Sequence, residues 1–187
     1  QQLVGTPWLH APPFGYAGSI RWVCSLRQFT DILHGIRGLN GVWGADIGVS
    51  PGCYALLYEI NPRYPASAEV IELATGVSCL TGKAQGRPSL GLQPTPHPIV
   101  GKAVYYAPRR LVVPAAGPWD DALRHAADVW RRPDFADIPH PGDVIEPGQP
   151  VVTVLADAPT EAECVARLKS RAAGLDQLFG IPPAPEE

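Results

Sequence analysis

Residues 54–64 read YALLYEINPRY, and this stretch decides the fold. Its first half is apolar and aromatic, which is typical of a β-strand. Its end carries an acid, an amide and a guanidinium at alternate positions, Glu59, Asn61 and Arg63. Because residues two apart in a strand share a face, these three side chains are predicted to project together, with Tyr58 pointing the other way.

A second strand is predicted just upstream, over residues 41–49, and a Ser-Pro-Gly-Cys turn joins it to the first. If the first and last residues of that turn pair with each other, Asp46 lies opposite Leu57. It is then one diagonal step from Glu59 and on the same face of the hairpin. Two carboxylates and the amide oxygen of Asn61 would converge there, and such oxygen ligands suit a hard cation.

Composition limits the classes of protein that the chain can be. Its 187 residues, with 45% hydrophobic and 18% charged, indicate a soluble globular protein of one domain or two small ones. The net charge of -3 and the scattered Lys and Arg residues argue against a nucleic-acid partner. No apolar run is long enough to span a membrane and no signal peptide is visible, so we expect a cytoplasmic protein without a membrane partner.

The cysteines and the lack of methionine lead to two further expectations. The four cysteines have no close spacing, which favours reduced thiols and argues against a zinc site. The sequence has no Met at all, from which we expect the chain to be a fragment or a processed piece of a longer protein.

Helical patterns lie on both sides of the predicted hairpin. Apolar residues recur at helical spacing over residues 26–39. After the hairpin, Ser67 is a natural N-cap, Glu69 falls in the first turn and Gly76 supplies the stop. The N-terminus of this second helix is predicted to face the same end of the hairpin, where its free N–H groups suit an anionic ligand.

The Pro-rich residues 84–99 are predicted to separate two bodies, residues 1–83 and residues 100–187. In the second body, residues 142–148 and 151–156 resemble two strands joined by a tight turn. A capping box at residues 160–163 begins a helix with Val165, Leu168, Ala172 and Leu175 on one face.

The EINPR sequence at residues 59–63, preceded by the Gly-Ala-Asp strand that ends at Asp46, resembles the metal-binding end of the ATP-grasp superfamily. The resemblance is to its carboxylate–amine ligases and biotin-carboxylase-like members. It implies an α+β fold in which residues 1–83 are the C-terminal half of the nucleotide-binding module, an antiparallel sheet with flanking helices. Residues 100–187 would be the small β-rich hammerhead or barrel-like piece that follows, closed by a terminal helix.

The resemblance also implies site residues and chemistry. Asp46, Glu59 and Asn61 would hold Mg²⁺ or Mn²⁺ bridging the phosphates of ATP. The side chain of Arg63 would contact the transferred phosphoryl group or the acyl phosphate. The residues placed where the carboxylate substrate or the attacking amine is met are Tyr64, Ser67 and Glu69.

The implied function is that of an ATP-dependent ligase, which activates a carboxylate as an acyl phosphate that an amine or similar nucleophile then attacks. The sequence departs from the family in one respect, because it contains no upstream half with a Gly-rich phosphate loop and its lysines. We therefore expect the chain to be incomplete by itself, with the N-terminal half or a second copy as its partner.

Two other classes stay open. Residues 142–148, GDVIEPG, resemble the turn of biotinyl and lipoyl carrier domains, although no Lys follows residue 151 until Lys169. The chain could also be a non-catalytic structural or regulatory subunit, in which an ATP-grasp remnant mediates association.

Overall fold

The computed structural model describes residues 2–4, 10–21, 35–50, 55–81, 98–128 and 131–182. The chain forms two compact units: unit 1 comprises residues 1–21 and 96–187, and unit 2 comprises residues 22–95. The sequence grouped the first 21 residues with the predicted metal site, whereas the contacts group them with the C-terminal part. The return to unit 1 at Pro96 falls within the Pro-rich segment.

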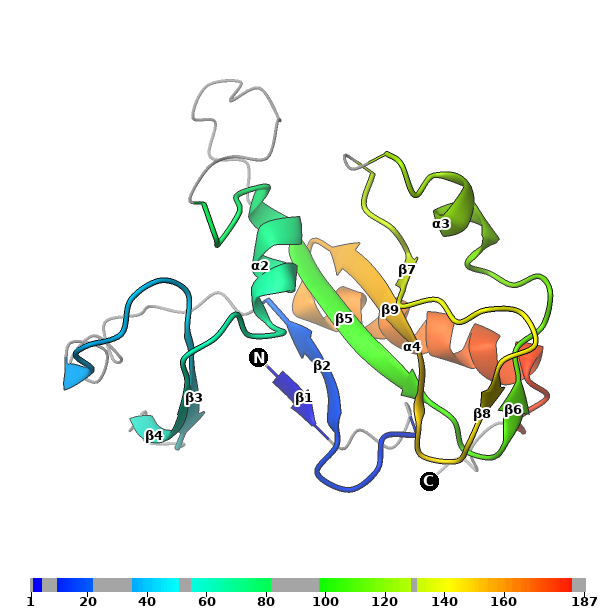
Figure 1. Ribbon diagram of the computed structural model, residues 1–187, viewed down its shortest axis with the longest axis horizontal. Coiled ribbons are helices and arrows are strands. Elements are labelled where there is room, and N and C mark those ends of the chain that lie inside the picture. Colours follow the sequence, from blue (N-terminus) through cyan, green and yellow to red (C-terminus); the bar gives the residue numbers. More distant parts are fainter. Residues whose placement is uncertain are drawn as a thin grey trace. The chain divides into compact units, whose positions relative to one another are not determined.

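Unit 1 is built on a five-stranded sheet in the order β1-β2-β5-β9-β7, and every neighbouring pair is antiparallel (Figure 1). Its strands are β1 (Gln2–Val4), β2 (Tyr16–Ile20), β5 (Ile99–Tyr106), β7 (Phe135–Ala136) and β9 (Pro150–Ala158). The pairing of β2 with β5 joins residues more than 80 positions apart, which no local pattern reveals. The two backbones approach closely, since a Cβ at Gly18 would lie 2.7 Å from the Cα of Ala103.

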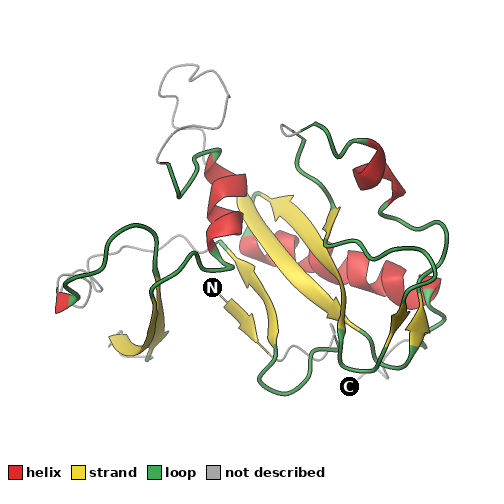
Figure 2. Ribbon diagram, viewed as in Figure 1, coloured by secondary structure: helices red, strands yellow, loops and turns green. Residues whose placement is uncertain are grey.

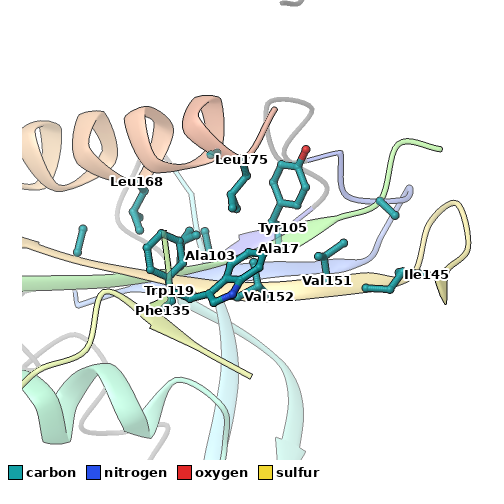
Figure 3. Close-up of a cluster of buried hydrophobic side chains, with 14 of the residues drawn as sticks. Ala17, Ala103, Tyr105, Trp119, Phe135, Ile145, Val151, Val152, Leu168 and Leu175 are labelled. Atoms are coloured by element: carbon teal, nitrogen blue, oxygen red, sulfur yellow. The ribbon is translucent and has the colours of Figure 1, made fainter. Parts of the chain in front are cut away.

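The helix α4 (Glu161–Leu178) covers one face of this sheet and closes the hydrophobic core (Figures 2 and 3). It begins as the sequence predicts, because the Thr160 hydroxyl accepts a hydrogen bond of 3.3 Å from the backbone N–H of Glu163. The buried residues of the helix are Cys164, Leu168, Ala172 and Leu175. Val165, predicted on that face, is only half-buried, and Cys164 one position earlier points inward instead.

A polar link ties α4 to the sheet within this core. The Tyr105 hydroxyl on β5 donates a hydrogen bond of 2.6 Å to Asp176 Oδ1 on α4, and His10 Nε2 lies 3.0 Å from the same oxygen. Burial, and then the hydrogen bond with Asp176, raise the pKa of Tyr105. The phenol therefore stays protonated and donates to the carboxylate.

The predicted hairpin between residues 142–148 and 151–156 is wrong. Residues Val144–Ile145 form β8, which pairs with β6 (Leu111–Val112) instead of with β9. The physical reason is that both edges of β9 are already occupied, one by β5 and the other by β7. The carrier-domain interpretation therefore loses its hairpin, and Lys169 lies inside α4.

The helix α3 (Asp120–Arg124) also belongs to unit 1. Just before it, Trp119 lies in the core with Phe135, and the two rings meet edge to face (Figure 3).

Unit 2 holds β3 (Gly44–Val49), β4 (Ala55–Asn61) and α2 (Ala68–Thr75). Gly76 ends α2 with a left-handed backbone (φ 68°), as the sequence predicts. Most of the helix predicted over residues 26–39 lies outside the described residues.

The chain is an α+β protein with antiparallel sheets and helices, which confirms the predicted fold class. Cys79 and Cys164 are free thiols, and Cys24 and Cys53 fall outside the described residues. Across the described ranges, no helix has the length and apolarity needed to cross a membrane.

Candidate metal centre

The strands β3 and β4 (Figure 1) form an antiparallel hairpin. In its register, Asp46 lies directly opposite Glu59. The prediction of Asp46 opposite Leu57 is therefore wrong, since Leu57 pairs with Ile47. Two shifts account for the difference. The pairing nearest the turn is displaced by one residue, with Val49 opposite Ala55, and a β-bulge then adds one residue to β4.

Each shift alone would move Glu59 to the other face of the hairpin from Asp46, because side chains alternate along a strand. Together they move the register by two residues and restore the shared face. The two residues are thus neighbours across the hairpin, with a different pairing from the one predicted. Both side chains are exposed to solvent.

Asn61 lies on the same face, two residues beyond Glu59 and opposite Gly44. Its Nδ2 donates a hydrogen bond of 3.4 Å to Asp46 Oδ2. The amide therefore reaches diagonally across the hairpin to the carboxylate instead of straight across to Gly44.

These three side chains fit a small divalent cation by the chemistry of their donors. Mg²⁺ is usually held in proteins by one or two carboxylates, completed by phosphate oxygens and water. The amide of Asn61 directs its nitrogen at Asp46, and a half-turn about χ2 would present the oxygen there instead. Within the described ranges, no group of three or more His, Cys, Asp or Glu residues forms an alternative metal site.

Arg63 does not extend the strand alternation as the sequence predicts. The strand β4 ends at Asn61, and the backbone N–H of Arg63 donates a hydrogen bond of 2.8 Å to the carbonyl of Asn61. Pro62 between them cannot donate to a strand ladder, which explains the turn. The guanidinium is therefore carried on an exposed turn just beyond Glu59 and Asn61, the ligand candidates on β4.

Tyr64 is held by a neighbour that the sequence analysis did not single out. Its hydroxyl donates a hydrogen bond of 2.8 Å to Glu72 Oε2 on α2, and Glu72 Oε1 accepts one of 2.6 Å from the backbone N–H of Cys79. Burial, followed by the hydrogen bond to Glu72, raises the pKa of Tyr64. Through these two hydrogen bonds, Glu72 on α2 links Tyr64, which precedes the helix, to Cys79, which follows it.

Ser67 and Glu69 stand at the start of α2, as expected. However, the Ser67 side chain makes no capping hydrogen bond, because its backbone is helical (φ -72°, ψ -17°) instead of extended. The helix begins through a turn in which the backbone N–H of Ala68 donates to the carbonyl of Pro65 at 3.0 Å. Glu69 lies in the first turn and is half-buried.

Tyr58 is the second residue that sequence reasoning missed. It was predicted to point away from Glu59, yet its ring lies against Gly48, two residues along β3 from Asp46. The bulge explains the difference, since Tyr58 is the residue of β4 without a partner in the register. The signal that could have indicated this position of the ring is Gly48, because a glycine leaves room for an aromatic side chain from the opposite strand.

No protein-family model and no curated protein matches the sequence. Two solved structures do resemble the fold. One is the crystal structure of L-amino acid ligase from Bacillus licheniformis, with a TM-score of 0.55 and 13% identity over 87% of this chain and 44% of that chain. The other is carboxyaminoimidazole ribonucleotide synthase from Aspergillus clavatus complexed with ATP.

The second likeness has a TM-score of 0.40 and 16% identity over 73% of this chain and 35% of that chain. The chain spans less than half the length of the amino acid ligase. The amino acid ligase is an ATP-grasp enzyme, and the likeness to it covers most of this chain. The chain therefore has an ATP-grasp fold.

Proposed function

We propose that this chain is the metal-binding half of an ATP-dependent ligase. The observation that carries the proposal is the direct pairing of Asp46 with Glu59, with Asn61 3.4 Å from the Asp46 carboxylate. The ATP-grasp fold shared with an L-amino acid ligase supports the same reaction class. A partner that completes the site, either the N-terminal half or a second copy, and a cytoplasmic location are parts of the proposal.

In this reaction a substrate carboxylate oxygen attacks the γ-phosphorus of ATP, ADP leaves, and an acyl phosphate forms. An amine or similar nucleophile then attacks the acyl carbon, and inorganic phosphate leaves as the new bond forms. Bound Mg²⁺ or Mn²⁺ would lower the repulsion between the two reacting anions. Asp46, Glu59 and Asn61 would hold that ion.

Arg63 would stabilise charge on the phosphoryl group, because a guanidinium can pair with two of its oxygens at once. Its place on the exposed turn directly after Asn61 supports this role. Ser67 and Glu69 would meet the carboxylate or the amine at the start of α2. Tyr64 would contribute less directly, since its hydroxyl is already donated to Glu72.

The test is the binding of Mn²⁺ to the whole chain, measured by electron paramagnetic resonance in the presence of a non-hydrolysable ATP analogue. Glu59→Gln removes one carboxylate with little change of shape, and we expect it to weaken Mn²⁺ binding by at least about tenfold. Asp46→Asn should have a similar effect.

The matched control is Glu161→Gln, which removes an exposed carboxylate from the first turn of α4 in the other unit. It should leave Mn²⁺ binding unchanged. Equal binding by the wild-type chain and Glu59→Gln would contradict the metal site and the ligase function with it.

A further inference from the structure

The arginines beside β9 point to a surface that unit 1 keeps covered. We propose that Arg167 and Arg171 on α4 close the edge of β9 beyond β7, and that without them this edge pairs with a β-strand from a second copy of the chain. The inference concerns unit 1 alone and does not depend on the proposed metal site.

The first observation is the sequence of the strand. Residues 151–156 of β9 read VVTVLA, a run that is uncharged and rich in β-branched side chains. Such segments pair readily with strands of other chains wherever an edge is open to them. A protein that contains this strand therefore needs both of its edges covered.

The second observation is how little of one edge is covered by backbone. The strand β9 lies between β5 and β7, and β5 pairs with it along its whole length (Figure 1). Among the described residues, β7 is only two residues long and pairs with Thr153 and Val154. One further hydrogen bond, of 2.9 Å, runs from the backbone N–H of Leu155 to the carbonyl of Asp134. The C-terminal end of β9 extends beyond this point.

That hydrogen bond also gives the direction of the carbonyls at this end of the strand. The N–H and C=O of one residue point to the same side of an antiparallel strand, and residues two apart point alike. The carbonyls of Leu155 and Asp157 therefore both point outward at the edge where β7 lies. These are the groups with which an added strand would pair.

Two arginines of α4 occupy these carbonyls. Arg171 Nη1 donates a hydrogen bond to the carbonyl oxygen of Leu155, and Arg167 Nη1 donates one of 2.5 Å to that of Asp157. The spacing matches, since four residues of an α-helix rise by about 6 Å and two residues of a strand by about 6.7 Å. One face of the helix thus supplies a guanidinium to each of the two outward carbonyls.

Ion pairs hold arginine side chains beside this edge. Arg171 Nη2 lies 2.6 Å from Asp134 Oδ1, and Arg132 Nη1 lies 3.0 Å from Asp157 Oδ2. The side chains of Arg171 and Arg132 are only 27% and 24% exposed, so both pairs are partly shielded from water. A strand that approached β9 here would have to displace these groups.

A second copy of the chain is the partner that this edge fits. The same edge of two copies can pair antiparallel about a two-fold axis, which gives a closed dimer. Identical strands match in length, and their β-branched side chains meet across the pair. The arginines prevent this pairing by hydrogen bonding to the carbonyls first.

The experiment is sedimentation velocity of the whole chain carrying both Arg167→Ala and Arg171→Ala. We expect its weight-average mass to exceed that of the wild-type chain by about twofold at the same concentration, since the edge then pairs two copies. The two substitutions make the net charge of -3 more negative, which by itself opposes association. A larger mass would therefore come from the uncovered edge.

Two controls separate strand pairing from other effects. The matched control combines Arg124→Ala on α3 with Lys169→Ala on α4, which removes the same charge from two exposed positions. Lys169 is two residues from each of the edge arginines and so lies on another side of the helix. This control should sediment as the wild-type chain does. An excess of a synthetic peptide of residues 150–158 should compete for the edge and return the double variant to the wild-type mass.

The outcomes are distinct. If the double variant is folded by circular dichroism and keeps the wild-type mass, the arginines only attach α4 to the sheet and the inference is wrong. An equal increase in mass for the matched control, or an increase that the peptide does not reverse, would also overturn it. If the double variant does not fold, Arg167→Ala alone decides, because it uncovers the carbonyl of Asp157 and keeps the ion pair between Arg171 and Asp134. A larger mass for this single variant supports the inference, and an unchanged mass contradicts it.

Discussion

The side chain of Cys164 illustrates how closely α4 packs against the sheet in unit 1. Its side chain is fully buried between α4 and the sheet, and its Sγ lies 3.6 Å from the carbonyl oxygen of Ala156. The strand below makes room for it, since a Cβ at Gly101 would lie 2.9 Å from this sulfur. Burial, and then the nearby Asp157, raise the pKa of the thiol to about 11.

This shift predicts a contribution of Cys164 to the pH dependence of stability. The unfolded chain releases the thiol proton near the ordinary value of 9, whereas the folded chain holds it until about 11. Stability should therefore fall as the pH rises between these values, because the unfolded state loses its proton first. Cys164→Ala removes the contribution, so its free energy of unfolding should fall less steeply over this range.

The measurement is urea unfolding at several pH values from 8 to about 11, the upper end being set by the shifted thiol. Other groups also titrate in this pH range, but the wild-type chain and Cys164→Ala share them, so they do not cause a difference between the two slopes. The same slope for Cys164→Ala and the wild-type chain would show that the thiol is not protected in the folded state.

At the scale of elements, α4 depends on its first turn. The hydroxyl of Thr160 accepts the backbone N–H of Glu163, which otherwise has no partner within the helix. Glu161 and Glu163 in the same turn complement the positive end of the helix dipole. Because α4 carries four residues of the core, the stability of its end affects the whole unit.

Thr160→Ala should therefore lower the free energy of unfolding by about 1 kcal/mol. Thr160→Ser keeps the hydroxyl and should retain most of the wild-type stability, which makes it the matched control. Chemical denaturation monitored by circular dichroism compares the three proteins. Equal losses for the Ala and Ser variants would mean that the methyl group, and not the cap, is responsible.

At the scale of the whole molecule, unit 1 contains all the described residues of the main hydrophobic cluster. Its two chain segments meet where the backbone N–H of Arg21 donates a hydrogen bond of 2.8 Å to the carbonyl of Val100. The ends left by removing the intervening residues would therefore lie close together, and a short linker can join them.

We predict that a chain with Arg21 linked to Pro98 through a few Gly and Ser residues folds by itself. It should show the circular dichroism of a mixed α and β protein and a cooperative thermal transition. The complementary peptide, residues 22–95, has only a two-stranded sheet and α2 among its described elements, and we expect it to unfold without cooperativity. A linked unit 1 without a cooperative transition would contradict the division.

The sequence by itself determined the local elements and the chemical character of the site. Alternating side chains at residues 59–61, the Thr160 cap and the Gly76 stop are all properties of a few neighbouring residues, and local backbone physics is enough to predict them. The α+β class followed from the resemblance of residues 59–63 to the ATP-grasp superfamily.

Only the tertiary structure decided which strands pair and where the hairpin bulges. The pairing of β2 with β5 depends on contacts between residues far apart in sequence, and β8 turned to β6 because β9 had no free edge. The displaced pairing next to the turn and the bulge at Tyr58 together set Asp46 opposite Glu59, and the Tyr58 ring came to lie against Gly48. Such choices depend on which partners are available in space, and a one-dimensional pattern does not contain that information.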